Sequence, residues 1–438
     1  MKPELDNPSV HRYMRVYNYY KQLILSQQLA PGSRLPSIRR CAAELQMSRT
    51  TVETAYMALA AEGYIISRPQ SGFYVTEIAR ARRQAEHRKK EIPQQKQKVR
   101  YNFASAGVDK ETFRFELWRR YIKSALRQDE RLLSYGEPQG EYDLREALCR
   151  YLQENRNVVC TPGHIVIGAG IQSLLDILCP LIQKRKQIFF YNPEFRQGRA
   201  IFEDYDFQIC GSKKEKPDVC YVSPSQITSW GEVLSVQERM KLLREASREN
   251  MLLIEDDYNS EFCYVHHPAP SIQGLAGGEG VVYLGTFSRM LLPSIRLSFM
   301  VLPSDLLEPY EKRKDFYNQT ASKTEQIALC QFIRDGHLES QIRKARKYYQ
   351  AKSKLLCQEA QRIFGDLAKV TASETDFLSL LEIRSEKKIE NILKETEKYG
   401  ISVLPAGESD RGIRLALSCA AVPAEEFSQA LMLLKQCV

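Results

Sequence analysis

The sequence predicts an α/β protein with a mostly parallel sheet, preceded by a small helical domain that ends in a two-stranded wing. After residue 100, short continuous apolar runs alternate with longer helical ones, as in strands that are buried on both faces. Before residue 76, two helical periods lie close together and a hairpin pattern follows them. Residues 1–100 hold 18 Lys and Arg against 8 Asp and Glu, a net charge of +10, whereas the rest holds 45 against 46. The front part therefore has the positive charge that a polyanion attracts.

Both front helices have start signals. Pro36 and Ser37 open the first helix and Ser48 opens the second, each hydroxyl at the place of an N-cap. In the second helix an apolar period over residues 52–59 faces the core. The side chains that this leaves on the outer surface near the N-terminus are Arg49, Thr50, Glu53 and Thr54. A recognition helix presents that end to base edges, so the pattern predicts DNA contact.

A short hairpin follows the second helix. Gly63 ends the helix, and residues 64–67 and 73–75 predict two strands around a turn at 68–72. The basic tip of this hairpin would touch phosphate or the minor groove. An ordinary domain of two core helices and a hairpin is the alternative that this pattern alone leaves open.

The front segment resembles the GntR-type winged helix-turn-helix domain. Four motifs carry the resemblance: Pro36-Ser37-Ile38-Arg39, Ser48-Arg49-Thr50-Thr51-Val52, Glu62-Gly63-Tyr64 and Gly72-Phe73-Tyr74-Val75. The resemblance implies that Gly72 shapes the wing and that the helix starts contact the backbone and bases of double-stranded DNA. The predicted DNA-binding residues are Arg34, Ser37, Arg39, Ser48, Arg49, Thr50, Thr51 and Gly72.

Composition sets the domain boundaries and excludes other classes of protein. Residues 80–100 are charged, Gln-rich and without apolar period, which predicts a DNA-binding domain at 1–76, a linker at 77–100 and a second domain at 101–438. No apolar run approaches a membrane span and the first ten residues lack the apolar region of a signal peptide, so we expect a cytoplasmic protein without a membrane partner. The 11 cysteines form no Cys-x-x-Cys pair, which predicts reduced thiols and no metal site.

Six apolar runs predict the strands of the second domain. They are residues 165–167, 187–191, 219–222, 251–255, 281–284 and 297–302. An open α/β sheet places its ligands at the carboxyl ends of its strands. We therefore expect the functional site along those ends.

Four strands carry or adjoin residues that could bind a ligand or take part in a reaction. Residues 168–172 form a glycine-rich turn before a helix, whose N–H groups could hold a phosphate. Carboxylates at 255–257 directly follow a strand and suit a metal, a cationic ring nitrogen or a capped loop. Residues 284–289 and Arg296 bring hydroxyl and guanidinium groups together, as an anion cradle requires. Arg414 lies within an apolar strand and needs a partner, either a ligand carboxylate or an internal acid.

Together these motifs resemble the fold-type I aminotransferases, which bind pyridoxal 5′-phosphate, and with the front domain the whole chain is similar to the MocR family of transcription regulators. The likeness includes residues 133–140 with Leu144-Arg145, residues 191–195 and residues 255–262. It implies a smaller C-terminal α+β subdomain and a homodimer. In such a family Asp256 would hold the pyridine nitrogen, Tyr258 the ring hydroxyl and Phe195 the ring face.

The same resemblance assigns the remaining site residues. The phosphate would be held by Gly170, Ile171, Gln172, Thr286, Ser288 and Arg296. Arg414 would clamp the carboxylate of an amino-acid effector. Near the ring, this chain departs from the family at Phe195, where Tyr is usual, and at Gln226-Ile227, where His-Gln is usual.

The largest departure concerns the Schiff-base lysine. The family's Thr-Phe-Ser-Lys is here Thr286-Phe287-Ser288-Arg289. A guanidinium stays charged and is not a useful nucleophile, and the missing amine would also have been the base for the α-proton shift. We therefore expect no catalytic residue, no turnover and, at most, noncovalent binding of pyridoxal 5′-phosphate.

The sequence thus predicts a homodimeric transcription regulator whose degenerate aminotransferase-like domain senses a small metabolite, an amino acid and/or pyridoxal phosphate. Two alternatives stay open. A true aminotransferase with an attached DNA-binding domain would need another lysine, such as Lys213, Lys214 or Lys216. A purely structural dimerisation domain would bind nothing.

Overall fold

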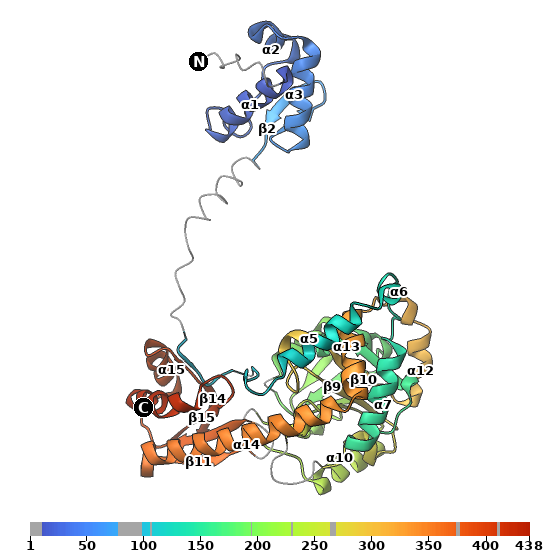
Figure 1. Cartoon of the computed structure of the whole chain (residues 1–438), viewed down its shortest axis with the longest axis vertical. Coiled ribbons are helices and arrows are strands. Elements are labelled where there is room, and N and C mark those ends of the chain that lie inside the picture. Colours follow the sequence, from blue (N-terminus) through green and yellow to red (C-terminus); the bar gives the residue numbers. More distant parts are fainter. Residues whose placement is uncertain are drawn as a thin grey trace. The chain divides into compact units, whose positions relative to one another are not determined.

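The computed structural model divides into two compact units, Met1–Lys96 and Gln97–Val438 (Figure 1). It describes residues 11–77, 99–105, 107–193, 195–228, 231–262, 269–373, 377–409 and 412–438. Most of the predicted linker, residues 78–98, lies outside the described residues. No helix in the described part of the chain is long and apolar enough to cross a membrane.

The front unit consists of α1 (Arg12–Leu25), α2 (Ile38–Leu45), α3 (Arg49–Ala61) and the hairpin β1 (Ile65–Arg68) and β2 (Gly72–Val75). Both predicted N-caps are confirmed, because Ser37 Oγ accepts from Arg40 N at 3.3 Å and Ser48 Oγ accepts from Thr51 N at 3.1 Å. The strands pair antiparallel, as the predicted wing requires. Helix α1 was not expected. It packs on α3 through aromatic rings, with Tyr20 and Tyr56 edge to face at 5.5 Å.

The second unit is built on a seven-stranded sheet in the order β4-β10-β9-β8-β7-β5-β6. Its strands are β4 (Ile165–Gly168), β5 (Gln187–Phe190), β6 (Gln208–Cys210), β7 (Val219–Val222), β8 (Leu252–Asp256), β9 (Val281–Thr286) and β10 (Ser298–Val301). Only β10 runs antiparallel to its neighbours, so the predicted mostly parallel sheet is confirmed. All six predicted strands form, and the structure adds a seventh strand, β6, at the edge of the sheet.

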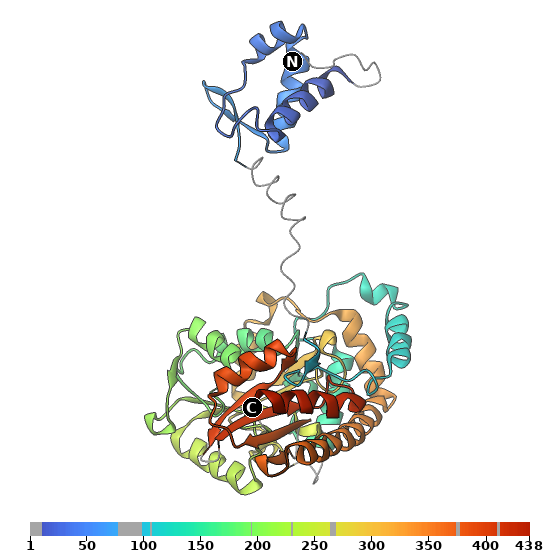
Figure 2. The ribbon, with the colours of Figure 1, turned by 90° about the vertical axis from the view of Figure 1, so that its left-hand side faces the viewer.

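Helices cover both faces of this sheet, because side chains of its strands pack into two cores with different helices. Figure 2 shows the second unit from the side of its C-terminal elements, which are coloured orange to red. Val166 points into one core with α8 and α12, whereas Ile165 and Ile167 point into the other with α7 and α13. This alternation of buried apolar side chains explains the continuous apolar runs in the sequence. The helices are α5 (Phe115–Ala125), α6 (Asp129–Leu132), α7 (Tyr142–Arg156), α8 (Ile171–Leu181), α9 (Arg196–Asp204), α10 (Val236–Glu249), α11 (Ile272–Leu275), α12 (Ser304–Glu311) and α13 (Lys323–Arg334).

A smaller antiparallel sheet in the order β11-β12-β15-β14 forms the C-terminal subdomain, as expected. The long helix α14 (His337–Phe364) leads into it. Its other elements are β11 (Ala368–Ala372), β12 (Leu378–Ile383), α15 (Ile389–Lys398), β13 (Ile401–Ser402), β14 (Leu404–Ser409), β15 (Gly412–Ser418) and α16 (Phe427–Cys437). The first strand of the unit, β3 (Tyr101–Asn102), pairs with β13, so the start of this unit is attached to the C-terminal subdomain.

Candidate functional site

A cavity of about 540 Å³ opens at the carboxyl ends of the large sheet's strands. It brings together every residue that the sequence assigns to the cofactor and to the lysine position: Gly170, Ile171, Gln172, Phe195, Asp256, Tyr258, Thr286, Ser288, Arg289 and Arg296. These residues come from separate strand ends, which the topology places at one edge of the sheet. One cavity therefore gathers all of these predicted residues.

One wall of the cavity suits a phosphate. Helix α8 begins at Gly170, which has a φ of +106° and offers no side chain to cap the helix. The guanidinium of Arg296 lies against this turn, since Nη2 donates to Ala169 O at 3.2 Å. The hydroxyl of Ser298 donates to Thr286 Oγ1 at 2.9 Å, and that of Thr286 to Ser288 Oγ at 3.2 Å. Helix N–H groups, a guanidinium and hydroxyls are the donors that an anion requires.

Another wall presents a buried carboxyl group. Asp256 is 6% exposed, and its Oδ2 accepts from the Tyr221 hydroxyl at 2.6 Å. Its Oδ1 is buried without a hydrogen-bond partner. Burial raises the pKa of Asp256 to about 7. An unsatisfied buried oxygen is costly, and a protonated ring nitrogen of a ligand would satisfy it.

Behind Asp256, a buried ion pair connects β8 to α7. Arg156 Nη2 lies 2.7 Å from Asp257 Oδ2, and both side chains are almost fully buried. Burial alone would raise the pKa of Asp257, but Arg156 and the Tyr283 hydroxyl lower it below its usual value. Burial and the nearby Asp257 raise the pKa of Glu255 and of Glu261 to about 7. This cluster positions the strand end that carries Asp256.

Arg289, which the sequence resemblance assigns to the lysine position, lines the cavity. Its Nη1 donates to Asn259 Oδ1 at 2.5 Å. Its guanidinium carbon lies 5.2 Å from the ring centroid of Tyr258 and 5.0 Å from that of Phe377. Among the described residues that line the cavity there is no lysine. Lys213, a lysine that the enzyme alternative would use, instead donates to the Tyr191 hydroxyl at 2.9 Å.

Arg414 does not line the cavity. It lies on β15 opposite Glu382 on β12, and its Nε is 3.2 Å from Glu382 Oε1. This is the internal ion pair that the sequence left open beside the ligand carboxylate. The effector role of Arg414 therefore rests on the resemblance alone.

Sequence reasoning missed several residues of the site. Tyr221 orients Asp256 and lies 5.1 Å from Phe195, ring to ring. Asn259 holds Arg289 and in turn donates to Gln226 Oε1. Tyr221 lies in a fully buried strand. A buried tyrosine needs a partner for its hydroxyl, and this is the one signal in the sequence that could have pointed to Tyr221.

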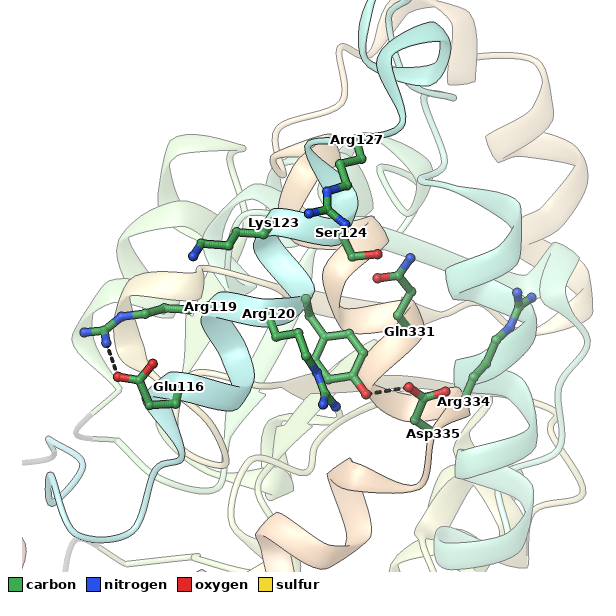
Figure 3. Close-up of a pocket in the computed structure, with 10 residues that line it drawn as sticks. Glu116, Arg119, Arg120, Lys123, Ser124, Arg127, Gln331, Arg334 and Asp335 are labelled. Atoms are coloured by element: carbon green, nitrogen blue, oxygen red, sulfur yellow. Dashed lines mark hydrogen bonds and ion pairs between the residues drawn. The ribbon is translucent and has the colours of Figure 1, made fainter.

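A larger hollow, about 650 Å³, lies between α5 and α13 (Figure 3). Basic side chains line it, including Arg119, Arg120 and Arg127. Arg119 pairs with Glu116, and the Tyr121 hydroxyl donates to Asp335. The hollow is formed by helix surfaces and holds no strand end and none of the predicted site residues. We therefore take the smaller cavity as the candidate site.

The front unit presents the predicted DNA-binding residues on its surface. Arg49 and Thr50 are exposed at the start of α3, and Arg39 is exposed on α2. Arg34 forms an isolated bridge with Tyr74 of the wing, and a Cβ on Gly72 would lie 3.5 Å from Arg34 Nε. Arg34 thus joins the segment before α2 to the wing. The other predicted residues on this unit are Ser37, Ser48 and Thr51, of which the two serines are exposed.

Comparison with known proteins agrees with both parts of the chain. Residues 12–75 match the bacterial regulatory proteins of the gntR family, and residues 101–218 and 224–433 match the aminotransferases of class I and II. The HTH-type transcriptional regulator YhdI of Bacillus subtilis is 34% identical over 425 residues, which cover 93% of this chain and 91% of that protein. The probable rhizopine catabolism regulatory protein MocR of Rhizobium meliloti is 28% identical, with coverage of 90% and 86%.

Among solved structures, the kynurenine aminotransferase of Pyrococcus horikoshii superposes with a TM-score of 0.67. The match has 20% sequence identity and covers 81% of this chain and 93% of that one. At this identity the likeness shows the fold. It confirms the predicted aminotransferase-like architecture of the second unit.

Proposed function

Because this chain belongs to the MocR-type transcription regulators, in which a gntR-family domain precedes a class I and II aminotransferase domain, we propose that its second domain is a noncatalytic sensor. The front domain binds operator DNA, and the second domain binds a small anionic metabolite that alters this binding. One observation supports the proposal: the cavity is lined by groups that suit a phosphate and a ring nitrogen, and its described lining includes Arg289 and no lysine. A ligand shifts such a regulator by its difference in affinity for two arrangements of the protein.

The residues of the cavity fit pyridoxal 5′-phosphate held without a covalent bond. Gly170–Gln172 N–H groups, Ser288 and Arg296 would hold the phosphate, and Asp256 Oδ1 would accept from the ring nitrogen. Phe195 would cover one face of the ring. The cofactor supplies an aldehyde that reacts with amines, and this chain's own contribution is to bind and orient it. Since the described lining holds no lysine, it also offers no amine as the base for a proton shift.

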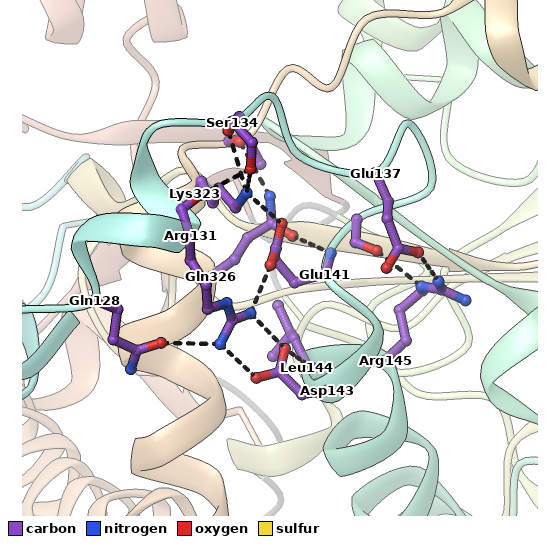
Figure 4. A network of polar contacts seen from close by, with 12 residues as sticks. Gln128, Arg131, Ser134, Glu137, Glu141, Asp143, Leu144, Arg145, Lys323 and Gln326 are labelled. Atoms are coloured by element: carbon purple, nitrogen blue, oxygen red, sulfur yellow. Dashed lines mark hydrogen bonds and ion pairs between the residues drawn. The ribbon is translucent and has the colours of Figure 1, made fainter. Parts of the chain in front are cut away.

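We further propose that the regulator is a homodimer. Leu133 and Tyr135, two positions apart in the sequence, are 89% and 104% exposed, which is unusual for large apolar side chains. Their segment is held firmly (Figure 4): Lys323 Nζ donates to Ser134 O at 3.2 Å, and Arg131 Nη1 lies 3.0 Å from Asp143 Oδ2. A rigid segment with exposed apolar side chains suits a second copy of the chain. Two front domains would then read two half-sites.

Equilibrium dialysis against pyridoxal 5′-phosphate tests the sensor, with and without borohydride reduction before denaturation. We expect retention that is reversible and does not survive denaturation in either arm. Retention that survives denaturation after reduction would mean that a lysine reacts, and would favour an aminotransferase instead. If no retention occurs, a gel-shift screen of anionic metabolites on DNA upstream of the chain's own gene follows. No metabolite effect there would favour a structural domain.

A further inference from the structure

We infer that the hollow between α5 and α13 is a second DNA contact, which binds the phosphate backbone of the DNA that the front unit holds. The inference rests on the proposed function, because the front unit must bring DNA to the chain. It goes beyond that function by giving the second unit a DNA contact of its own. Since both units belong to one chain, DNA bound by the first is present at the second at a raised effective concentration, and a weak contact suffices.

Helix α5 concentrates positive charge in a unit that is otherwise balanced. Residues 114–127 hold five Lys and Arg against one Glu, a net charge of +4, whereas residues 101–438 as a whole hold 45 basic against 46 acidic residues. A helix surface that only keeps a protein in solution mixes both signs, as α10 does with four basic and three acidic residues. A local field of one sign attracts a partner of the opposite sign.

The five basic side chains that line the hollow fall into two groups. Arg119 pairs with Glu116, and Arg334 pairs with Glu146 at 3.0 Å. Among the described residues, no ion pair includes the other three, which are Arg120, Lys123 and Arg127. All three are exposed, so an anion that binds them displaces counter-ions and buries little charge. Proteins bind the backbone of nucleic acids in this way.

The spacing of these three side chains suits a duplex. Arg120, Lys123 and Arg127 recur at i, i+3 and i+7, so they follow one face of α5 and of the turn after it. Seven residues of helix rise about 10 Å, and a duplex carries one phosphate charge per about 1.7 Å of its axis, so several phosphates lie within reach. Ser124 and Gln331 face each other between the two helices (Figure 3), and side chains of both types also donate to phosphate oxygens of DNA.

The salt dependence of DNA binding tests this inference. We would measure by fluorescence anisotropy, over a series of KCl concentrations, the affinity of the full chain for a duplex from upstream of its own gene and for one of unrelated sequence. In Arg120→Gln/Lys123→Gln/Arg127→Gln the slope of log affinity against log salt should become shallower by about 2 to 3, since each phosphate contact contributes about 0.9. The affinity for both duplexes should fall by the same factor, because phosphate contacts carry no sequence information.

Helix α10 offers a matched control. Lys241→Gln/Arg244→Gln/Arg248→Gln removes the same charge at the same spacing from exposed positions of a helix with both signs, and should leave the slope unchanged. A cooperative thermal unfolding transition like that of the wild type shows that each variant folds. If the α5 variant does not fold, Lys123→Gln and Arg127→Gln singly should each reduce the slope by about 1.

Each other outcome has one meaning. An unchanged slope in the folded α5 variants overturns the DNA contact at the hollow and leaves DNA binding by the front unit intact. Equal reductions in the α5 and α10 variants also overturn it, because the effect would then come from the total charge of the chain. Loss of the dimer in sedimentation of the α5 variant would assign the hollow to a second copy of the chain instead. If the wild-type chain binds neither duplex, the proposed function itself fails.

Discussion

Asp256 carries a carboxyl group that is buried in the wall of the cavity. One of its oxygens is buried without a partner, and burial raises its pKa to about 7. In the unliganded protein, ionisation of this group above neutral pH places a charge where water cannot solvate it. A ligand with a ring N–H would remove that cost by donating to the carboxylate. Asp256 therefore lowers the stability of the unliganded protein and would strengthen the binding of such a ligand.

The variant Asp256→Asn tests the effect on stability. The folded pKa of Asp256 lies above the model-compound value of 3.8, so its contribution to stability is complete below pH 3.8 and is lost as the pH rises through about 7. At pH 8 the unliganded variant should therefore be more stable than the wild type, by on the order of 1–3 kcal/mol. Thermal unfolding between pH 5 and 8 measures this, and Glu255 and Glu261 should preserve part of the wild-type slope.

The same variant should bind pyridoxal 5′-phosphate at least about 10-fold more weakly, because an amide does not hold a protonated ring nitrogen as a carboxylate does. Asp305→Asn, on the exposed surface of α12, is the matched control and should change neither property. An Asp256→Asn protein with wild-type affinity would contradict the role of Asp256.

Arg49 is the residue of the front unit that we expect to contribute most to DNA binding. It is exposed at the start of α3, where a recognition helix meets base edges. Arg49→Ala should cost about 1–3 kcal/mol of affinity if it makes a bidentate base contact. Fluorescence anisotropy with a labelled operator measures this loss. Arg40→Ala, which removes a surface ion pair with Glu44, serves as control, and an unchanged affinity of Arg49→Ala would move the DNA contacts to another surface.

Most residues of the candidate site could be predicted from the sequence, because in an open α/β sheet the functional side chains lie at the ends of apolar strands. Asp256 is predicted from its position directly after one apolar run, and Arg296 from its position directly before another. Arg414 shows the limit of this reasoning. An arginine within an apolar strand indicates only that its charge needs a partner. The identity of that partner depends on the register of β12 against β15, which places Glu382 opposite Arg414. This register is a nonlocal property that the local sequence does not contain.

At the scale of elements, the start of α8 forms the part of the cavity where we propose that a phosphate binds. Gly170 approaches Arg296 so closely that a Cβ there would lie 2.4 Å from Nη2. Its φ of +106° also belongs to the region that favours glycine. A side chain at this position would displace the guanidinium of Arg296 and strain the turn.

Gly170→Ala should weaken the binding of pyridoxal 5′-phosphate about 10-fold or more, because Arg296 must move and the turn is strained. Gly277→Ala is the matched control. That glycine also has a positive φ, +66°, but a Cβ there meets nothing within 4 Å. Calorimetry on both variants separates the loss of the phosphate contact from the effect of backbone strain. Equal losses of affinity for pyridoxal 5′-phosphate in the two variants would contradict a phosphate site at α8.

Strands were easier to predict than the elements at the edges of each unit. A central strand buried on both faces leaves a continuous apolar run, as in β7 and β8. Strand β6 is three residues long at the sheet edge and begins with an exposed glutamine, so it leaves a weak pattern. Helix α1 buries tyrosines whose hydroxyls blur the apolar period, and the sequence did not reveal it.

At the scale of the whole molecule, the exposed pair Leu133 and Tyr135 predicts an interface. The double variant Leu133→Asp/Tyr135→Asp should be monomeric in sedimentation experiments at concentrations where the wild type is a dimer. Its folded stability should change by less than about 0.5 kcal/mol, since both side chains are exposed. Met432→Asp, 49% exposed on α16, should leave the dimer intact. A dimeric double variant would exclude this segment from the interface.

The absence of a lysine from the described lining of the cavity also sets how quickly the regulator can respond. A covalently held ligand leaves only after a bond is hydrolysed or exchanged, whereas a noncovalent one leaves when its contacts break. With association at about 10⁵ to 10⁷ M⁻¹ s⁻¹ and a dissociation constant near 1 μM, a ligand would stay for roughly 0.1 to 10 s. Occupancy would then follow the current level of the metabolite and keep no record of an earlier one.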